Sequence, residues 1–257
     1  MQTFKTLQAI RYLVAVLFAY HFSLATSSAQ SEAGLWMELG AEKKLSKKFS
    51  VGLETDLRTR NNLKTMDRWS VGLSAEYKPV KYVKFDAGYT LLNNNFREDI
   101  SYNTSGSYNN WRPSYWGIRH RVNASVTGTY KFSNSLRISL RERWQYTYRP
   151  EKTVTRWDFD NSKWENKVRS GKGKNQLRSR LQLEYDKKGA LFTPYANVEL
   201  YNAWKVEKIR YTVGTDYNLS KQHTFSLFYR YQNMKDVDAD DYDPDMHYIG
   251  VGYKFKF

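Results

Sequence analysis

The sequence predicts an all-β protein, an antiparallel β-barrel that spans a membrane, and three observations support this. Apolar and polar residues alternate in one short segment after another, as in strands with one apolar and one polar face. Short turns alternate with longer or more variable loops, as they do in transmembrane barrels. Aromatic residues recur at the same end of successive segments, on the apolar face, where one membrane interface would collect them. A soluble sandwich would also alternate, but it gives no reason for this placement.

The last segment has the pattern around which the rest of the chain is organised. Apolar residues occupy every second position from Ile249 to Phe257, with Gly or Lys between them. This pattern resembles the closing strand of bacterial outer-membrane barrels, which ends in Phe. The resemblance implies recognition by the outer-membrane barrel-assembly machinery as a partner.

Composition agrees with a thin wall rather than a thick core. Hydrophobic residues make up 40% of the 257 residues and the mean hydropathy is −0.76, yet aromatic residues reach 16%. The aromatic content argues against disorder. Few aliphatic and many aromatic residues suit a sheet that is one residue thick.

The N-terminus predicts export. Residues 1–29 form a signal peptide, with Lys5 and Arg11 before an apolar run and small residues before an expected cleavage at Gln30. Residues 30–257 form the barrel domain. The absence of Cys excludes lipoprotein anchoring and disulfides. The net charge of +15 suggests nucleic acid, but export argues against it. We expect a monomer in the bacterial outer membrane, in contact with its lipids and lipopolysaccharide.

The number of strands is the open point of the architecture. Eleven alternating segments can be found, namely 35–41, 49–57, 69–77, 83–91, 116–130, 136–148, 177–185, 192–201, 209–217, 225–231 and 249–257. Because bacterial single-chain barrels have an even number of strands, we expect about twelve, with the twelfth hidden in the loop 149–175. Ten is the alternative, if 35–41 is not a wall strand. Within the loop, Thr153–Trp157 and Lys163–Lys167 are expected to pair as a hairpin above the membrane.

Two sets of residues follow from the strand registers. An aromatic girdle at the short-turn side is expected to contain Tyr77, Tyr130, Tyr185, Tyr217 and Phe257. The inward rows collect many charges, and the candidate lumen-lining residues are Arg119, Arg121, Arg141, Arg143, Arg178, Arg180, Arg210, Arg230, Glu54, Asp56 and Glu199. Arg137, Asp86, Glu184 and Asp216 share this face.

The charged lumen has two interpretations. Rings of Arg favour anionic solutes in pores, which would make the protein a small-solute channel. Alternatively, interlocked pairs of Arg and carboxylate fill a narrow barrel and hold it together, because open channels are typical only at about 16 strands. Both a structural and a pore role therefore remain.

Several motifs place the chain near a known family. They are Trp36, the run Lys43–Phe49, the strand Gly52–Arg58, Arg119-His120-Arg121 and Pro194–Leu200. Over nearly the whole mature chain these resemble the domain of unknown function 2490 family of outer-membrane barrels. The resemblance implies the fold and the location, and it carries no catalytic or ligand residues.

Other chemistry finds little support in the sequence. A barrel lipid hydrolase needs a Ser beside a His, and the candidates His120, His223, His247 and Ser226 do not match that arrangement. The acidic loop 236–245 has the alternating carboxylates that suit calcium, but not the Gly and Glu of an EF-hand loop. We therefore expect no enzyme, cofactor or metal site. Aromatic residues in the loops 93–113 and 149–175 leave a surface binding or adhesion role open.

Overall fold

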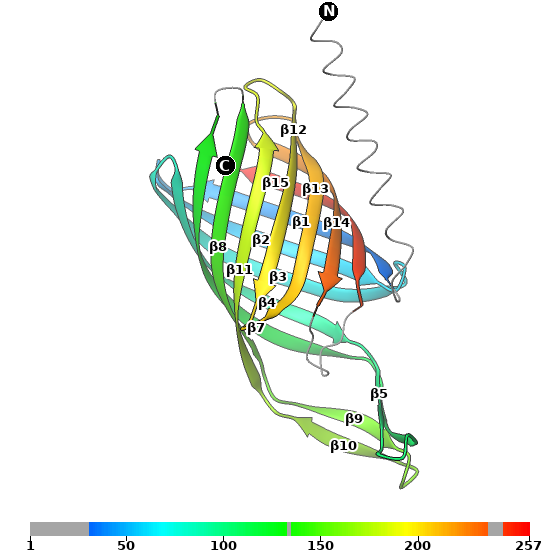
Figure 1. The fold of residues 1–257 in the computed structure, drawn as a ribbon. Coiled ribbons are helices and arrows are strands. Elements are labelled where there is room, and N and C mark those ends of the chain that lie inside the picture. The colour runs from blue at the N-terminus through cyan, green and yellow to red at the C-terminus, as the bar shows by residue number, and fades with distance from the viewer. Residues whose placement is uncertain (1–30, 133–134, 236–243) are drawn as a thin grey trace, which may run out of the picture. The chain divides into compact units, whose positions relative to one another are not determined.

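The computed structural model describes residues 31–132, 135–235 and 244–257, and it contains strands but no helix among them (Figure 1). The expected signal peptide, residues 1–29, lies outside the described residues. No helix in this part of the chain could cross a bilayer. The strands are β1 (Glu32–Lys44), β2 (Phe49–Arg60), β3 (Thr65–Val80), β4 (Val83–Phe96), β5 (Asp99–Tyr102), β6 (Tyr108–Arg112), β7 (Tyr115–Lys131), β8 (Leu136–Arg149), β9 (Lys152–Asp158), β10 (Lys163–Arg169), β11 (Lys172–Tyr185), β12 (Phe192–Asn202), β13 (Val206–Asn218), β14 (His223–Met234) and β15 (Met246–Lys256).

Eleven of these strands close into a barrel in the order β1-β15-β14-β13-β12-β11-β8-β7-β4-β3-β2. Neighbours are antiparallel except at one seam, where β1 and β15 run parallel from Glu32↔Met246 to Glu42↔Lys256. The prediction of twelve strands is therefore wrong, and so is the alternative of ten, because β1 is a full wall strand. An odd number becomes compatible with closure once the first and last strands pair in parallel, and then every strand has two neighbours.

The strand alternation sorts side chains to the two faces as the sequence predicts. Outward residues such as Leu73 and Ile249 are each 62% exposed, although they are strongly apolar. This is the pattern of a wall whose outer face meets hydrocarbon. The expected girdle residues Tyr77, Tyr130, Tyr185, Tyr217 and Phe257 all belong to the outward rows at the end of the barrel with the short turns. We call this end the turn rim and the opposite end the loop rim.

The two long loops form a second sheet. Its order is β10-β9-β6-β5, so the hairpins 99–112 and 152–169 pair with each other through β6 and β9. The expected hairpin is confirmed, with Trp157 opposite Trp164. The twelfth wall strand sought here does not exist, because β9 and β10 pair outside the barrel (Figure 1).

Aromatic residues fill the inside of the barrel beside the seam. Trp36, Phe228, Met246 and Tyr248 form a buried cluster, with the Trp36 and Tyr248 rings 5.3 Å apart and edge to face. Gly250 makes room for it, since a Cβ there would lie 2.0 Å from the Phe228 ring. The inward glycine in the last strand is thus a packing requirement.

Replacing Gly250 by Ala should destabilise the barrel by about 1–3 kcal/mol, because the Phe228 ring must move to accommodate the methyl group. Gly128 is the matched control, since a Cβ at this outward position meets nothing within 4 Å. Denaturant titration of the protein folded in vesicles measures both variants. Equal stabilities of Gly250→Ala and Gly128→Ala would contradict this account of the seam.

Candidate functional site

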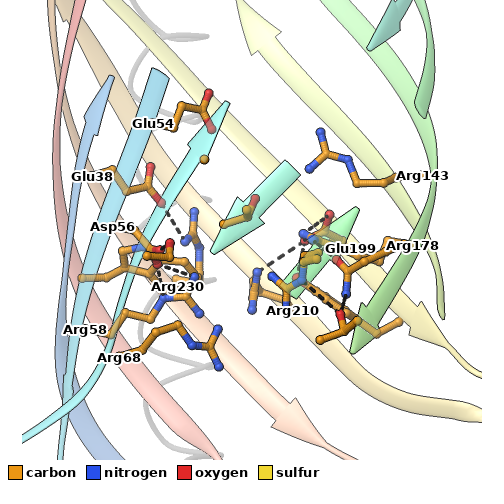
Figure 2. A pocket seen from close by; sticks show the side chains of 18 of the residues that line it. Glu38, Glu54, Asp56, Arg58, Arg68, Arg143, Arg178, Glu199, Arg210 and Arg230 are labelled. Atoms are coloured by element: carbon orange, nitrogen blue, oxygen red, sulfur yellow. Dashed lines mark hydrogen bonds and ion pairs between the residues drawn. The ribbon is translucent and has the colours of Figure 1, made fainter. Parts of the chain in front are cut away.

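The barrel encloses a cavity of about 530 Å³ lined by charged side chains. It runs from Arg149 and Lys172 near the loop rim to Ser226 and Lys254 near the turn rim. The structure brings all eleven candidate lumen residues to this one cavity: Arg119, Arg121, Arg141, Arg143, Arg178, Arg180, Arg210, Arg230, Glu54, Asp56 and Glu199. Figure 2 shows several of them, drawn from strands on both sides of the space.

The charges around the cavity do not balance. The lining contains fifteen Arg and Lys side chains against five carboxylates. The basic ones are Arg58, Arg68, Arg119, Arg121, Arg141, Arg143, Arg149, Lys172, Lys174, Arg178, Arg180, Lys208, Arg210, Arg230 and Lys254, and the acidic ones are Glu38, Glu54, Asp56, Glu199 and Glu207. The lumen therefore has a strong excess of positive charge.

Glu199 is the centre of the largest ion-pair network. Its carboxylate accepts hydrogen bonds from Arg141 at 2.6 Å, from Arg178 at 2.9 and 3.0 Å, and from the Tyr201 hydroxyl at 2.8 Å. A fourth donor, Arg210, reaches it at 3.5 Å. The residue is only 3% exposed. One carboxylate thus ties together β8, β11, β12 and β13.

A second network lies on β1, β2 and β14. Asp56 pairs with Arg58 at 2.6 Å, and Glu38 pairs with Arg230 at 3.3 Å. The guanidinium groups of Arg58 and Arg230 also lie over the Trp36 ring, 3.3 and 4.0 Å from its centroid. In the view of Figure 2 the Asp56 and Glu199 networks stand on opposite sides of the cavity.

The Trp36 ring links the two networks. Arg210, which reaches Glu199, is 5.0 Å from the centroid of the same ring. Three guanidinium groups therefore converge on one indole, an arrangement that the negative face of an aromatic ring favours. The ring is 3% exposed, so it is a buried surface against which the three guanidinium groups pack.

Arginines also face one another directly across neighbouring strands of the wall. Arg141 lies directly across from Arg180 and Arg143 directly across from Arg178 in the pairing of β8 with β11. Like charges in directly opposed positions are destabilising. Among the described residues, the Arg180 guanidinium makes no hydrogen bond or ion pair, and that of Arg121 bonds only to the Thr147 hydroxyl, at 3.2 Å.

Hydrogen-bond donors also exceed acceptors around the cavity. Among the described residues that line the cavity, the buried nitrogens without an acceptor include the Nε atoms of Arg141, Arg143, Arg149, Arg178 and Arg210, and Nε1 of Trp36. Buried polar groups are normally paired with protein, water or an ion. The lumen is thus chemically suited to hold acceptor groups that the chain itself does not supply.

Other inward carboxylates also have partners. Asp86 accepts a bond from Arg143 at 3.1 Å, Glu184 pairs with Arg137, and Asp216 accepts from Ser226 at 2.7 Å. At the turn rim, Lys254 pairs with Glu42 at 2.7 Å. The interlocking pairs expected of a filled barrel are therefore present, but they leave the middle of the lumen basic.

The three histidines of the described residues lie on the outward face, each beside a tyrosine. Nδ1 of His120, His223 and His247 is within hydrogen-bond distance of the Tyr89, Tyr253 and Tyr229 hydroxyl groups at 2.7, 2.8 and 2.6 Å. Ser226 points inward to Asp216. No imidazole hydrogen bonds a Ser hydroxyl between residues 31 and 257, as far as these are described.

Most of the acidic loop, residues 236–243, lies outside the described residues. Asp245 is described, and it anchors the loop end by accepting bonds from the Tyr231 hydroxyl at 2.6 Å, Asn233 at 2.8 Å and the Met234 N–H at 2.8 Å. Burial raises the pKa of Asp245, but these hydrogen bonds outweigh it and the pKa is lowered.

Sequence reasoning missed part of the site. The sequence shows Trp36 as a family motif on an inward position, but not its contacts. The Trp36 ring packs against Arg58, Arg210 and Arg230, which lie on three different strands. Arg58 and Tyr201 also line the cavity. Both follow a carboxylate by two residues, at Asp56 and Glu199, and that spacing places them on the same face of a strand.

Replacing Glu199 by Ala should destabilise the barrel by about 3–5 kcal/mol, because it leaves several guanidinium groups buried without their counter-charge. Glu54→Ala is the matched control, since Glu54 is an exposed lumen carboxylate without a side-chain partner among the described residues. We expect it to change stability by less than about 0.5 kcal/mol. Denaturant titration in vesicles measures both; comparable losses would show that Glu199 is not the centre of the network.

Comparisons with known proteins agree with the fold. Among solved structures, the chain is similar to the β domain of the Bordetella autotransporter BrkA (TM-score 0.50, 14% identity, 82% of each chain covered). It is also similar to the NanC porin (TM-score 0.47, 13% identity, 88% of this chain and 98% of the other) and to the translocator domain of the autotransporter NalP from Neisseria meningitidis (TM-score 0.47, 9% identity, 90% and 93%). At these identities the likeness concerns the fold alone.

At the level of sequence, no curated protein matches the chain. The family model described as "Protein of unknown function (DUF2490)" matches residues 33–243, which include β1 to β14 and the whole arginine-rich cavity wall except β15. The chain therefore belongs to the DUF2490 family, as the motifs around Trp36 and Arg119 predict.

Proposed function

We propose that this protein is a narrow channel for small anions in the bacterial outer membrane. The observation that carries the proposal is the lumen lining, with fifteen basic side chains against five acidic ones. Fixed positive charge inside a low-dielectric wall lowers the energy of an anion in the lumen and raises that of a cation.

The hydrogen-bond inventory supports the same conclusion. The lining has buried donors without acceptors, at the Nε atoms of Arg178 and Arg210 among others. An entering anion offers acceptor oxygens or halide to such donors. Structural filling alone does not account for Arg180, which stands between Arg141 and Glu199 in the strand pairing. It forms no ion pair among the described residues, because the Glu199 carboxylate is already paired with Arg141, Arg178 and Arg210.

The size of the cavity limits the solute. A volume of about 530 Å³ is within the range of pockets that hold single small molecules. Eleven strands also make a barrel between the small ones whose side chains fill the interior and the large water-filled porins. We therefore propose passage of ions and small anionic solutes, and not of polymers.

Conductance of the purified, refolded protein in planar bilayers tests this function. Under a KCl gradient, the reversal potential should have the sign of a chloride-selective pore. Arg121→Gln with Arg180→Gln should lower the ratio of anion to cation permeability several-fold, because each change removes a positive charge without breaking an ion pair.

Lys163→Gln is the control for this experiment, since Lys163 lies on β10 outside the barrel. It should leave the reversal potential unchanged. Negligible current through the wild-type protein, or an unchanged permeability ratio in the double variant, would leave the lumen with a structural role only.

A second candidate function, surface binding, rests on the external sheet. Ile100, Trp111, Trp157 and Trp164 are directly opposite one another in a row across β5, β6, β9 and β10. Trp164 is 51% exposed, and the aromatic residues Tyr102 and Tyr108 of the same sheet are 59% and 55% exposed. Exposed aromatic groups of this extent are typical of binding surfaces.

Purified lipopolysaccharide is the probe for this alternative. Trp164→Ser combined with Tyr108→Ser should weaken its binding at least tenfold in surface plasmon resonance if the external sheet is the binding surface. Tyr82→Ser, an exposed aromatic change at the turn rim, should not. Equal binding by the two variants would remove the sheet from consideration.

A further inference from the structure

The outward face of the barrel contains a carboxylate at the depth of the hydrocarbon. Arg141 and Arg143 line the cavity, so Glu142 between them points outward. It is flanked along β8 by Leu140 and Trp144, which are 52% and 47% exposed. Among the described barrel strands, no other Asp or Glu takes an outward position between the rims.

The depth of Glu142 follows from the girdle. Ile138 is opposite the girdle residue Tyr130, and Glu142 lies four residues further along β8. At about 3.3 Å per residue and a tilt of about 40°, this is roughly 10 Å inside the aromatic ring. An apolar band of about 25 Å puts the carboxyl group near its middle.

Glu142 is only partly satisfied by its own barrel. The Ser179 hydroxyl, directly opposite on β11, donates to Oε2 at 2.6 Å. Oε1 has no hydrogen-bond partner among the described residues. Water is absent at this depth, and ionisable groups in the hydrocarbon normally face a partner.

We infer that Glu142 and Ser179 form the centre of a two-fold interface between two copies of this barrel. The pair is self-complementary, which an isologous contact requires. A two-fold axis along the membrane normal, outside the barrel and in front of the β8–β11 pair, places Glu142 of each copy opposite Ser179 of the other. In this proposal the chain is a dimer, whereas the sequence analysis expects a monomer.

In such an interface every donor and acceptor of the Glu142 and Ser179 side chains can be paired. With the carboxyl group in its neutral form, the Oε1 hydroxyl of Glu142 donates to Ser179 Oγ of the second copy. That Ser donates in turn to Oε2 of its own Glu142, as observed within one barrel. Two carboxyl groups and two hydroxyls thus form one ring of four hydrogen bonds.

Small residues lie on one side of Glu142. Ala124 and Gly128 are diagonal to it on β7, on either side of Val126, and a Cβ at Gly128 would meet nothing within 4 Å. Small residues such as Gly and Ala let backbones approach in membranes. Glu142 nevertheless specifies the contact, because lipid chains can cover small apolar residues equally well.

The absence of Cys allows a clean crosslinking test. Glu142→Cys in reconstituted membranes should form a crosslinked dimer with a short bis-maleimide reagent. Val251→Cys, an outward position on the opposite wall at 42% exposure, should not. Equal crosslinking at both positions would overturn the proposal.

The oligomeric state, measured without introduced cysteines or crosslinker, provides the second test. Native mass spectrometry should find a dimer for wild type and for Glu142→Gln, which keeps a donor and an acceptor. Glu142→Leu should raise the dimer dissociation constant at least tenfold while the barrel still folds, because Leu suits lipid. A monomeric wild type, or a Glu142→Leu variant as dimeric as wild type, would refute the interface.

Discussion

The constraint that governs this molecule is that a sheet in hydrocarbon can leave no backbone N–H or C=O unpaired. The chain meets it with eleven strands by pairing its first and last strands in parallel. The seam in turn determines what lies inside the barrel beside it. Trp36 comes from β1, Phe228 from β14 and Tyr248 from β15, and they meet only because β15 is inserted between β14 and β1.

Inside the barrel, closure brings many arginines together, and specific contacts compensate their charges. Arginines on neighbouring strands face the same narrow space, and burial of unpaired charge is costly. Glu199 compensates three of them and Trp36 braces three, with Arg210 shared between the two. The compensation is local. Arg121 and Arg180 form no ion pair among the described residues, although Arg180 is directly opposite Glu199, and the proposed anion channel depends on these two side chains.

Much of this could be predicted from the sequence, because the information is local. A period of two residues assigns Leu73 to the outer face and Arg178 to the inner face without knowledge of strand pairing. The girdle and the list of lumen arginines follow from it. The parallel seam could not be predicted in this way, since it joins Glu32 to Met246 and leaves no mark on the periodicity of either strand.

Two further features were not predicted from the sequence, for related reasons. The strands β5 and β6 lie in a segment rich in Asn, Ser and Tyr, and their pairing partner β9 lies some fifty residues later. Glu142 does not stand out in the sequence, because the inward arginines on either side of it dominate the local pattern. The signal was nevertheless present, as a carboxylate in a row otherwise composed of apolar residues.

The parallel seam also determines the sidedness of the chain. In a barrel with an even number of strands, the first strand begins and the last strand ends at the same rim. Here Glu32 begins β1 at the loop rim, whereas Phe257 follows β15 at the turn rim, where its carbonyl accepts the Lys44 N–H at 3.1 Å. A membrane-impermeant reagent applied to one side of a sealed vesicle can therefore reach one of these two positions but not the other.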